Sequence, residues 1–471
     1  MNVVIGIEIH LELKTNTKMF SGAKVDVVSQ PNTNVNAKDL AHPGTLPTLN
    51  KEGVRKSIMA CHALNFKIDP IAKFDKKNYF YSDLSSGYQD TQNYFPVGKD
   101  GYVEITLEDG SVKKIGIERV HMEEDTAKQY HMDDITLIDF NRAGTPLIEI
   151  VSKPEMSSGY EAKAYVEAIR EIVTHLGISD GKMEDGSLRC DLNISINKEG
   201  EGFGVRTEVK NINSISNLEK AVEYEIARKK ELMENGETEA QTTRRFDEKT
   251  NTTVHMRNKE SASDYKYIPD PNLPIIRIDE AWIEKIKNEM EELPNDIRKR
   301  YEEDYSLSLR DTNILIANKK LLKLFEETIK YNKNYGDVAN IILTDIQSDI
   351  KEEKVKIEDI DPEKLAELLK IVKDGDVSLS TAKKKILPEI YIGKDPKDVV
   401  EEKGLKQIND EKTIREKIQK ILENNPKFIE KHKSGGDRVA SSIVGLVMKE
   451  TKGMANPMLA NKIATEELNK Y

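Results

Sequence analysis

The chain has 471 residues, a formal net charge of −11 and one tryptophan, and 33% of its residues are charged while 37% are apolar. This length suits two to four domains, and the apolar content is too high for a disordered chain. No apolar run approaches the ~18 residues of a membrane helix, and the N-terminus lacks the basic region of a signal peptide. Two cysteines exclude a disulfide framework and a four-cysteine zinc site. We therefore expect a cytoplasmic protein without membrane association.

Three segments alternate apolar and polar positions with the two-residue period of a β-strand. They span residues 5–14, 188–196 and 206–210. Their polar positions are Glu8, His10, Glu12, Lys14, Arg189, Asp191, Asn193, Ser195, Arg206, Glu208 and Lys210. The alternation predicts strands with one buried and one polar face. Cys190 falls on an apolar face, so we expect a buried side chain and not a nucleophile.

Turn and capping residues punctuate the same region. A capping box at residues 216–219 predicts a helix that ends at 235–236. A second helix is expected over about residues 162–176. Hairpin-like turns are predicted at three Asp-Gly segments, residues 99–101, 108–110 and 184–186.

The pattern changes near residues 293–295 to helical periodicity with Lys- and Glu-rich faces. We therefore predict an α+β protein in three parts. Residues 1–293 form a strand-rich domain with an antiparallel sheet and flanking helices, 294–403 an all-α domain, and 404–471 a small all-α tail. Residues 401–471 carry 14 Lys and Arg against 11 Asp and Glu, a net +3, so the remainder carries −14. This asymmetry favours a polyanion partner for the tail, with an ordinary solvated helical surface as the alternative.

Carboxylates gather on the predicted strands and turns of the first domain. Mg²⁺ prefers carboxylate oxygens and commonly bridges to substrate phosphates, so acids that converge from several strands would suit an ATP-using site. The alternative is that each acidic strand face is simply exposed to solvent. The acidic positions are Glu8, Glu12, Glu123, Glu124, Asp125, Asp191 and Glu208, with His10 and His121 among them.

A second group combines basic and aromatic residues. Residues 73–81 mix three lysines with four aromatic side chains, which suits a nucleotide or an RNA end, although an ordinary amphipathic strand has the same composition. The chain contains no GxxxxGK[ST] motif, so ATP use requires another scaffold. It also lacks GxSxG and an N-terminal cysteine nucleophile.

Long motifs along the whole chain resemble one family. They include GIEIHLELKTNTKMFSG (6–22), GIERVHMEEDTAK (116–128), DFNRAGTPLIEIVSKPEM (139–156), SDGKMEDGSLRCDLNISI (179–196) and VGLVMKETKGMANP (444–457). They are similar to motifs of the B subunit of the aspartyl/glutamyl-tRNA amidotransferases, the GatCAB complexes. An archaeal relative, the E subunit, carries an extra domain, whereas this chain passes directly from Pro274 into the helical region.

The resemblance implies a cradle domain with a kinase-like site that uses ATP and Mg²⁺. Such an enzyme phosphorylates the side-chain carboxylate of Glu on tRNA(Gln) or Asp on tRNA(Asn), and ammonia then displaces the phosphate. The implied partners are an amidase A subunit that supplies ammonia, a small C subunit that clamps the complex, and the misacylated tRNA. The helical and tail domains would grip the tRNA. The sequence does not decide between Glu-tRNA and Asp-tRNA.

The motifs also imply individual roles. The metal ligands would be Glu8, His10, Glu124, Asp191 and Glu208. The catalytic residues would be Lys77, Glu123 and Glu124. The substrate-binding residues would be Tyr79, Tyr81, Tyr88, Arg142 and Arg206, and the tRNA-binding residues Arg438, Lys449 and Lys452. Some relatives bind zinc through four cysteines, whose places hold Ser21, Ala23, Asn36 and Asp39 here, so no zinc is expected.

The chain departs from the family at one further segment. Relatives commonly have a lysine where this chain has Ser86, and an Ile-Ser pair where it has Asp90-Thr91. A basic group near the phosphates is then missing or supplied from elsewhere. Two alternatives follow: a tRNA-binding scaffold that has lost phosphorylation, and a stand-alone kinase or ligase acting on a small acid. The helical tail argues against the second.

Overall fold

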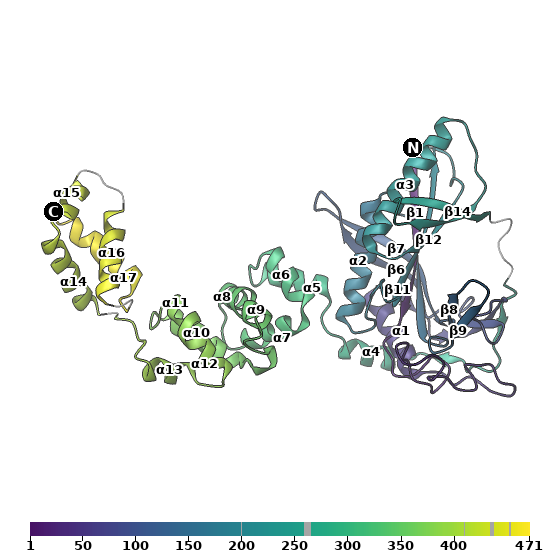
Figure 1. The fold of residues 1–471 in the computed structure, drawn as a ribbon, viewed down its shortest axis with the longest axis horizontal. Helices are drawn as coiled ribbons and strands as arrows, with labels where there is room; N and C mark the ends of the chain where they lie inside the picture. Colours follow the sequence, from purple (N-terminus) through teal and green to yellow (C-terminus); the bar gives the residue numbers. More distant parts are fainter. Residues whose placement is uncertain (199, 259–264, 409, 434–437, 452–453) are drawn as a thin grey trace. The chain divides into compact units, whose positions relative to one another are not determined.

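The computed structural model describes residues 1–471 except 199, 259–264, 409, 434–437 and 452–453. The chain divides into two units, residues 1–294 and 295–471 (Figure 1). The first contains strands and helices and the second is helical, so the α+β prediction is confirmed. No helix in the described part of the chain is long and apolar enough to cross a membrane.

A nine-stranded sheet forms the centre of the first unit, in the order β14-β13-β12-β11-β1-β10-β7-β6-β2. Neighbours are antiparallel, as expected, except for the parallel pair β12 and β13. These two strands run the same way because a long helix, α3 (Ile215–Glu234), connects them. The strands are β1 (Asn2–Glu12), β2 (Lys67–Ile68), β6 (Gly98–Thr106), β7 (Val112–Glu124), β10 (Pro146–Ser152), β11 (Leu188–Asn197), β12 (Thr207–Ile212), β13 (Thr242–Asp247) and β14 (Thr252–Asn258).

The two faces of this sheet differ in character. Alternate residues of β1 such as Ile7 and Ile9 are buried in a core with the apolar sides of the helices. Cys190 pairs with Ile9 and is also buried there, as predicted. The helices of this unit are α1 (Lys51–Ala63), α2 (Gly159–His175), α3 and α4 (Glu280–Glu289). The opposite face carries Glu8 and His10, so the alternation predicted from the sequence is confirmed.

Small sheets complete the first unit. A three-stranded sheet has the order β15-β4-β5, and two pairs join β16 to β3 and β8 to β9. The bounds are β3 (Ile71–Ala72), β4 (Asp75–Asn78), β5 (Tyr88–Thr91), β8 (Lys128–His131), β9 (Thr136–Asp139), β15 (Ile268–Pro269) and β16 (Ile276–Arg277). β5 packs beside β7, which brings the residues of β4 and β5 close to the polar face of the large sheet.

Two local predictions were wrong. Residues 99–101 form no turn, because β6 continues through them in one register with β7, and Asp100, at a φ of 55°, lies between the registered residues Lys99 and Gly101. Helix α3 is capped by Ser214, whose hydroxyl accepts from the amide of Asn217 at 3.1 Å, and not by Ser216. The turns at residues 108–110 and 184–186 are present.

The described residues of the second unit form two hydrophobic cores. One is built from residues between Ile297 and Leu405, and the other from residues between Ile414 and Leu468. The α-helices are α5 (Pro294–Glu303), α6 (Leu309–Ala317), α7 (Lys319–Thr328), α8 (Tyr335–Ile341), α9 (Gln347–Lys351), α10 (Pro362–Lys373), α11 (Leu379–Thr381), α12 (Leu387–Tyr391), α13 (Pro396–Glu402), α14 (Glu411–Asn424), α15 (Lys427–Lys433), α16 (Val439–Glu450) and α17 (Pro457–Leu468). Two π-helical segments, η1 (Ile342–Ile346) and η3 (Ala382–Ile386), and one 3₁₀ turn, η2 (Ile357–Asp359), lie among them.

Candidate active site on the polar face of the sheet

Three carboxylates from adjacent strands meet on the polar face. Glu8 of β1 lies opposite Asp191 of β11, and Glu208 of β12 lies opposite Asn193, two residues further along β11. One oxygen from each of Glu8, Asp191 and Glu208 lies within 4.8 Å of the other two. We call these residues the three-carboxylate group. The structure thus brings together three residues that the motifs implied as metal ligands.

Lysine and asparagine side chains partly neutralise this group. Lys210 contacts Asp191 at 2.5 Å and Glu208 at 3.4 Å, and Asn193 donates to Glu8 at 3.0 Å. Burial raises the pKa of Glu8, and the nearby charges of Glu149 and Asp191 raise it further. Glu8 is therefore a carboxylate whose ionised form a bound cation would stabilise.

A second group lies beside the first on the same face. His10 Nε2 lies 3.7 Å from Glu123 and 3.6 Å from Glu149, and His121 Nε2 lies 3.2 Å from Glu149. His10 therefore joins Glu123 and Glu149 and not the three-carboxylate group. Although burial alone raises the pKa of Glu149, the charges of His121, His10 and Lys77 hold it well below its usual range. The Nδ1 atom of His121 is buried and has no hydrogen-bond partner among the described residues.

Glu124 points to the other side of β7, since consecutive residues of a strand face opposite ways. Its carboxylate pairs with Lys38 at 3.1 Å, and Lys38 Nζ lies 5.0 Å from the ring centre of the core residue Phe20. It belongs to neither acidic group among the described residues. The expected convergence of Glu8, His10 and Glu124 is therefore corrected. Of the neighbouring residues Glu123 and Glu124, it is Glu123 that contacts His10.

Lys77 on β4 is held among aromatic rings. Its Nζ lies 4.8 Å from the ring centre of Tyr265 and 5.7 Å from that of Tyr79. Burial lowers the pKa of Lys77, but the nearby Glu123, Tyr267 and Glu149 raise it by more. The pKa therefore lies above that of an ordinary lysine, and the side chain stays a cation. It therefore contributes positive charge beside the second acidic group.

Among the predicted substrate-binding residues, some side chains are exposed and others already contact neighbouring residues. Tyr81 is largely exposed beside Tyr79, with ring centres 5.9 Å apart. Tyr88 stacks under Lys76, whose Nζ lies 4.1 Å from the ring centre. Arg142 donates to the carbonyls of Thr126 and Ala127 and lies 3.6 Å from Asp125, so it fixes a loop.

At the end of β1, the half-buried carboxyl of Glu12 lies close to Arg142. Burial and the charge of Asp125 raise the pKa of Glu12 to about 8. Asp125 itself pairs with Arg189 at 2.7 Å. Arg189 and Asp125 thus compensate each other, and neither is free to bind a ligand.

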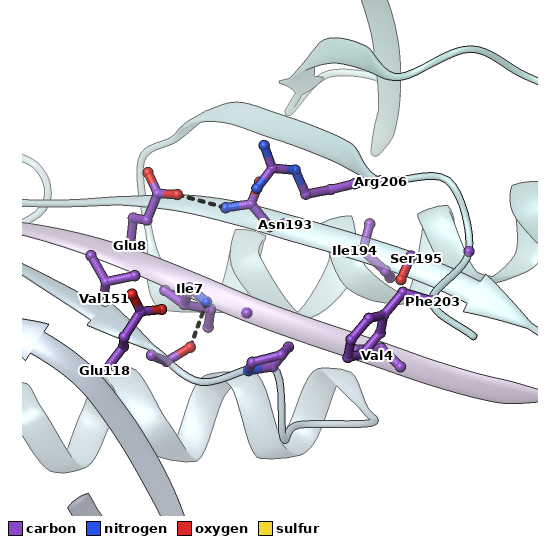
Figure 2. A pocket seen from close by; sticks show the side chains of 14 residues that line it. Val4, Ile7, Glu8, Glu118, Val151, Asn193, Ile194, Ser195, Phe203 and Arg206 are labelled. Atoms are coloured by element: carbon purple, nitrogen blue, oxygen red, sulfur yellow. Dashed lines mark hydrogen bonds between the residues drawn. The ribbon is translucent and has the colours of Figure 1, made fainter. Parts of the chain in front are cut away.

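A pocket of about 350 Å³ opens on the polar face next to Glu8 (Figure 2). β1 forms its floor with Val4, Gly6 and Glu8, and the segment that carries Phe203 and Arg206 forms one wall. Arg206, predicted to bind substrate, is exposed and lines this pocket. The pocket and the three-carboxylate group therefore share Glu8.

The departures from the family also have a place in the structure. Ser86 donates to the carbonyl of Tyr88 at 2.7 Å and so stabilises the turn before β5. Asp90 is fully buried next to Glu124. Burial and the charge of Glu124 raise the pKa of Asp90 to about 9, so its carboxyl is protonated at neutral pH.

The residues implied as tRNA contacts lie in the tail. Arg438 is exposed directly before α16, and Lys449 is exposed in the last turn of that helix. Lys452 lies outside the described residues.

Sequence reasoning missed Glu149 and Lys210. Glu149 lies in an apolar run, where only its pairing with His10 places it in the site. The alternation of residues 206–210 marked Lys210 as polar but gave it no role. The helpful signal would have been a charged residue interrupting an otherwise apolar strand, because such a residue is costly unless it has a partner.

The donor atoms of the two acidic groups decide which metal each group suits. Glu8, Asp191 and Glu208 offer oxygen only, which Mg²⁺ prefers. His10, Glu123 and Glu149 form a mixed nitrogen and oxygen set, which is more typical of transition metals. With Lys210 beside them, the three carboxylates have a formal charge of −2 when ionised, which a divalent cation balances. The three-carboxylate group therefore fits Mg²⁺.

Comparison with known proteins adds the family. The GatB/GatE catalytic domain matches residues 3–284, and a GatB domain matches residues 323–468. The B subunit of the aspartyl/glutamyl-tRNA(Asn/Gln) amidotransferase of Clostridium botulinum strain Eklund 17B is 46% identical over 471 residues, covering 99% of both chains. The protein of the same name from Mesoplasma florum is 48% identical over 460 residues, covering 97% of this chain and 96% of the relative. The resemblance drawn from the motifs is confirmed: the chain belongs to the GatB family.

Proposed function

We propose that this chain is the subunit of a tRNA-dependent amidotransferase that activates the side-chain carboxylate of Glu on tRNA(Gln), of Asp on tRNA(Asn), or of both. Activation is phosphorylation by ATP, and ammonia then displaces the phosphate to give the amide. The names of the full-length relatives support the overall reaction. The observation that carries the phosphorylation step is the three-carboxylate group beside an open pocket on the polar face.

The chemistry accounts for the charges on this face. The γ-phosphate of ATP and the carboxylate that attacks it are both anions, so their approach needs positive charge between them. Mg²⁺ held by Glu8, Asp191 and Glu208 would supply that charge to the phosphates. Lys77 stays cationic next to Glu123 and Glu149, and we propose that it attracts the carboxylate of the aminoacyl group.

His10 and His121 have a positioning role in this proposal. Each contacts Glu149, and this pairing fixes both imidazole rings against the sheet. The exposed Tyr81 and its neighbour Tyr79 offer ring faces to the terminal base of the tRNA. The aminoacyl end would then lie between these rings and the acidic groups.

The proposed partners follow from two features of the chain, the absence of a glutaminase motif in its sequence and the positive charge of its tail. It has no glutaminase nucleophile motif, so the ammonia comes from a separate amidase subunit, and a small C subunit completes a heterotrimer. The net +3 of residues 401–471 favours contact of the tail with the tRNA backbone through residues such as Arg438 and Lys449. The alternative, a scaffold without phosphorylation, is favoured only by the loss of the family lysine at Ser86.

The test supplies misacylated tRNA, ATP and ammonium chloride to the purified chain. Glu-tRNA(Gln) and Asp-tRNA(Asn) are assayed separately, and both ADP and the amidated aminoacyl-tRNA are measured. The proposal expects ADP and amide in equal amounts for at least one substrate. Tight tRNA binding without ADP release would establish the scaffold instead. Glutamine should replace ammonium only when the amidase subunit is added, and glutamine use by this chain alone would refute the proposed division of labour.

A further inference from the structure

One row of residues crosses the polar face from the three-carboxylate group to an arginine on β7. Asp191 lies opposite Glu8, and Glu8 lies opposite Val151 of β10. Val151, which Figure 2 shows beside Glu8, in turn lies opposite Arg119. Neighbouring strands are about 4.8 Å apart, so the backbones of Glu8 and Arg119 are separated by about 10 Å. The row therefore has carboxylates at one end and a guanidinium at the other.

The side chain of Arg119 lies on the polar face of the sheet. Residues directly opposite each other in an antiparallel pair point to the same face, and Val151 lines the pocket on the polar face. The next residues of β7 agree with this placement. Val120 and Met122 are buried in the core, and His121 contacts Glu149 on the polar face. Arg119 therefore lies on the same face as both acidic groups.

Tyr267 places Arg119 in the same region as Lys77. Burial raises the pKa of Tyr267, while the charges of Lys77 and Arg119 both lower it. The two cations thus lie near one phenol. The ring of Tyr267 also packs against that of Tyr265, with centres 6.1 Å apart, and Tyr265 covers Lys77. Two anions bound on this face could therefore lie side by side, each next to its own cation.

Arg119 differs from other cations of the site in having no acidic partner. Among the described residues no carboxylate forms an ion pair with it, and its Nε atom is buried without a hydrogen-bond partner. By contrast, Lys210 contacts Asp191 and Arg189 contacts Asp125. A buried donor without a partner costs free energy in the folded protein and needs an explanation. A bound anion would provide that partner.

We propose that Arg119 is a catalytic residue that binds the phosphoryl group while it passes from ATP to the aminoacyl carboxylate. The choice of phosphoryl transfer rests on the proposed function. In this step an oxygen of the carboxylate forms a bond to the γ-phosphorus. The bond from that phosphorus to the bridging oxygen breaks, and its electron pair leaves with ADP; no proton is transferred. Negative charge is then spread over the three equatorial oxygens of the group. The planar guanidinium can donate two parallel hydrogen bonds to such oxygens.

The position of Arg119 favours the phosphoryl group over the aminoacyl carboxylate as its ligand. Arg119 shares a row with Glu8, one of the carboxylates that fit Mg²⁺ and with it the phosphates of ATP. Lys77 is instead close to Glu123 and Glu149, which lie in other rows. The side chain between Glu8 and Arg119 is that of Val151, which offers no hydrogen bond. A phosphoryl group above it is therefore held from its two sides.

The first test separates binding of the transferring group from binding of the nucleotide. Arg119→Met keeps the approximate length of the side chain and removes its charge. With misacylated tRNA, ATP and ammonium chloride, this variant should lower kcat by about 10²–10³-fold, the usual loss for one preorganised donor. Its KM values for ATP and for aminoacyl-tRNA should change by no more than about twofold. Arg119→Lys keeps the charge but not the planar fork, and it should lose about tenfold.

The second test requires no turnover. ADP with aluminium fluoride mimics the planar phosphoryl group during transfer, and binding of ADP to the full chain is measured by calorimetry with Mg²⁺ and misacylated tRNA. Wild type should bind ADP at least about tenfold more tightly when aluminium fluoride is added, as expected for a transition-state analogue. Arg119→Met should bind ADP alone as wild type does and should gain no affinity from aluminium fluoride.

Three controls show whether the effect is local. Because Arg119 has no ion-pair partner among the described residues, Arg119→Met should melt within about 2 °C of wild type, whereas a structural role predicts a lower melting temperature. Arg277→Met removes an exposed arginine from β16 and is the matched control, with unchanged kcat. Guanidinium chloride at millimolar concentration should restore part of the activity of Arg119→Ala, because the free cation can occupy the space of the missing side chain.

The outcomes separate this inference from the proposed function. An unchanged kcat in Arg119→Met overturns the inference, and so does an equal loss of ADP affinity with and without aluminium fluoride. A raised KM for aminoacyl-tRNA at unchanged kcat would assign Arg119 to the carboxylate and overturns it as well. If wild type forms no amide, the proposed function fails and the fluoride test alone decides. A gain in ADP affinity that depends on Arg119 then supports the inference, and the absence of that gain overturns it.

Discussion

Replacing Glu8 by glutamine should stabilise the metal-free protein and at the same time abolish its response to Mg²⁺. Glu8, Asp191 and Glu208 have oxygens within 4.8 Å of one another. At that separation and an effective dielectric constant of about 20, each pair of like charges repels by about 3.5 kcal/mol. Glutamine has the same shape, and its amide oxygen still accepts from Asn193. The substitution therefore removes repulsion with little loss of contacts.

The net gain is smaller than the repulsion because other groups already offset it. Lys210 contacts Asp191 and Glu208, and the raised pKa of Glu8 shows that its ionised form is partly suppressed. We expect about 1–2 kcal/mol of added stability for Glu8→Gln, which corresponds to a rise in melting temperature of about 2–4 °C for a unit of this size.

The assay is thermal unfolding in EDTA and in a series of Mg²⁺ concentrations. Wild type should melt at higher temperature as Mg²⁺ increases, because a ligand of the folded state stabilises it by mass action. Glu8→Gln should melt above wild type in EDTA and show little Mg²⁺ dependence. Glu104→Gln, a partly exposed carboxylate paired with Lys114, is the control and should behave as wild type. A variant that melts below wild type in EDTA, or keeps the full Mg²⁺ response, would refute the reasoning.

Three further predictions test other parts of the molecule. Glu123→Gln should lower ADP release by orders of magnitude. Glu124→Gln should cost about 2–4 kcal/mol of stability, because it breaks a mostly buried ion pair with Lys38; the assignment fails if activity assays show that Glu124→Gln lowers ADP release by the folded protein more than Glu123→Gln does. Deletion of residues 405–471 should raise the KM for aminoacyl-tRNA and flatten its salt dependence while the cradle still hydrolyses ATP, and an unchanged KM at moderate salt would show that the tail does not bind tRNA. Burial raises the pKa of Glu467, but hydrogen bonds from Lys470, Gln419 and Arg415 lower it to about 2. The ionised carboxylate therefore stabilises the tail fully at pH values above 4.5, the ordinary pKa of a glutamate, and this stability is lost as the pH falls toward 2. The protection of α17 amides against hydrogen exchange, taken relative to the intrinsic exchange rate at each pH, should therefore fall over that range in wild type, and an equally steep fall in Glu467→Gln would contradict the role of this carboxylate.

The sequence by itself was enough to determine the character of the long segments, although it misplaced a turn at residues 99–101 and the cap of α3. A two-residue period places Ile7 and Ile9 on one face and Glu8 and His10 on the other, whatever strands lie beside them. The same two-residue period predicted that Cys190 is buried, and the 3.6-residue period predicted the helical second half. Local chemistry decides these features, so neighbours in the chain suffice to predict them. The long motifs likewise carried the family, because they need only the order of residues.

Tertiary structure alone decided which side chains meet. The period of a strand gives the face of a residue but not its partner, which depends on the register between strands far apart in sequence. The pairing of β1 with β10 brings Glu149 to His10, and its pairing with β11 brings Asp191 to Glu8. A one-residue difference along β7 separates Glu123, which contacts His10, from Glu124, which faces Lys38. Register is set by the packing of the whole sheet against its helices, and for that reason the acidic groups could be anticipated by residue type but assembled only by the fold.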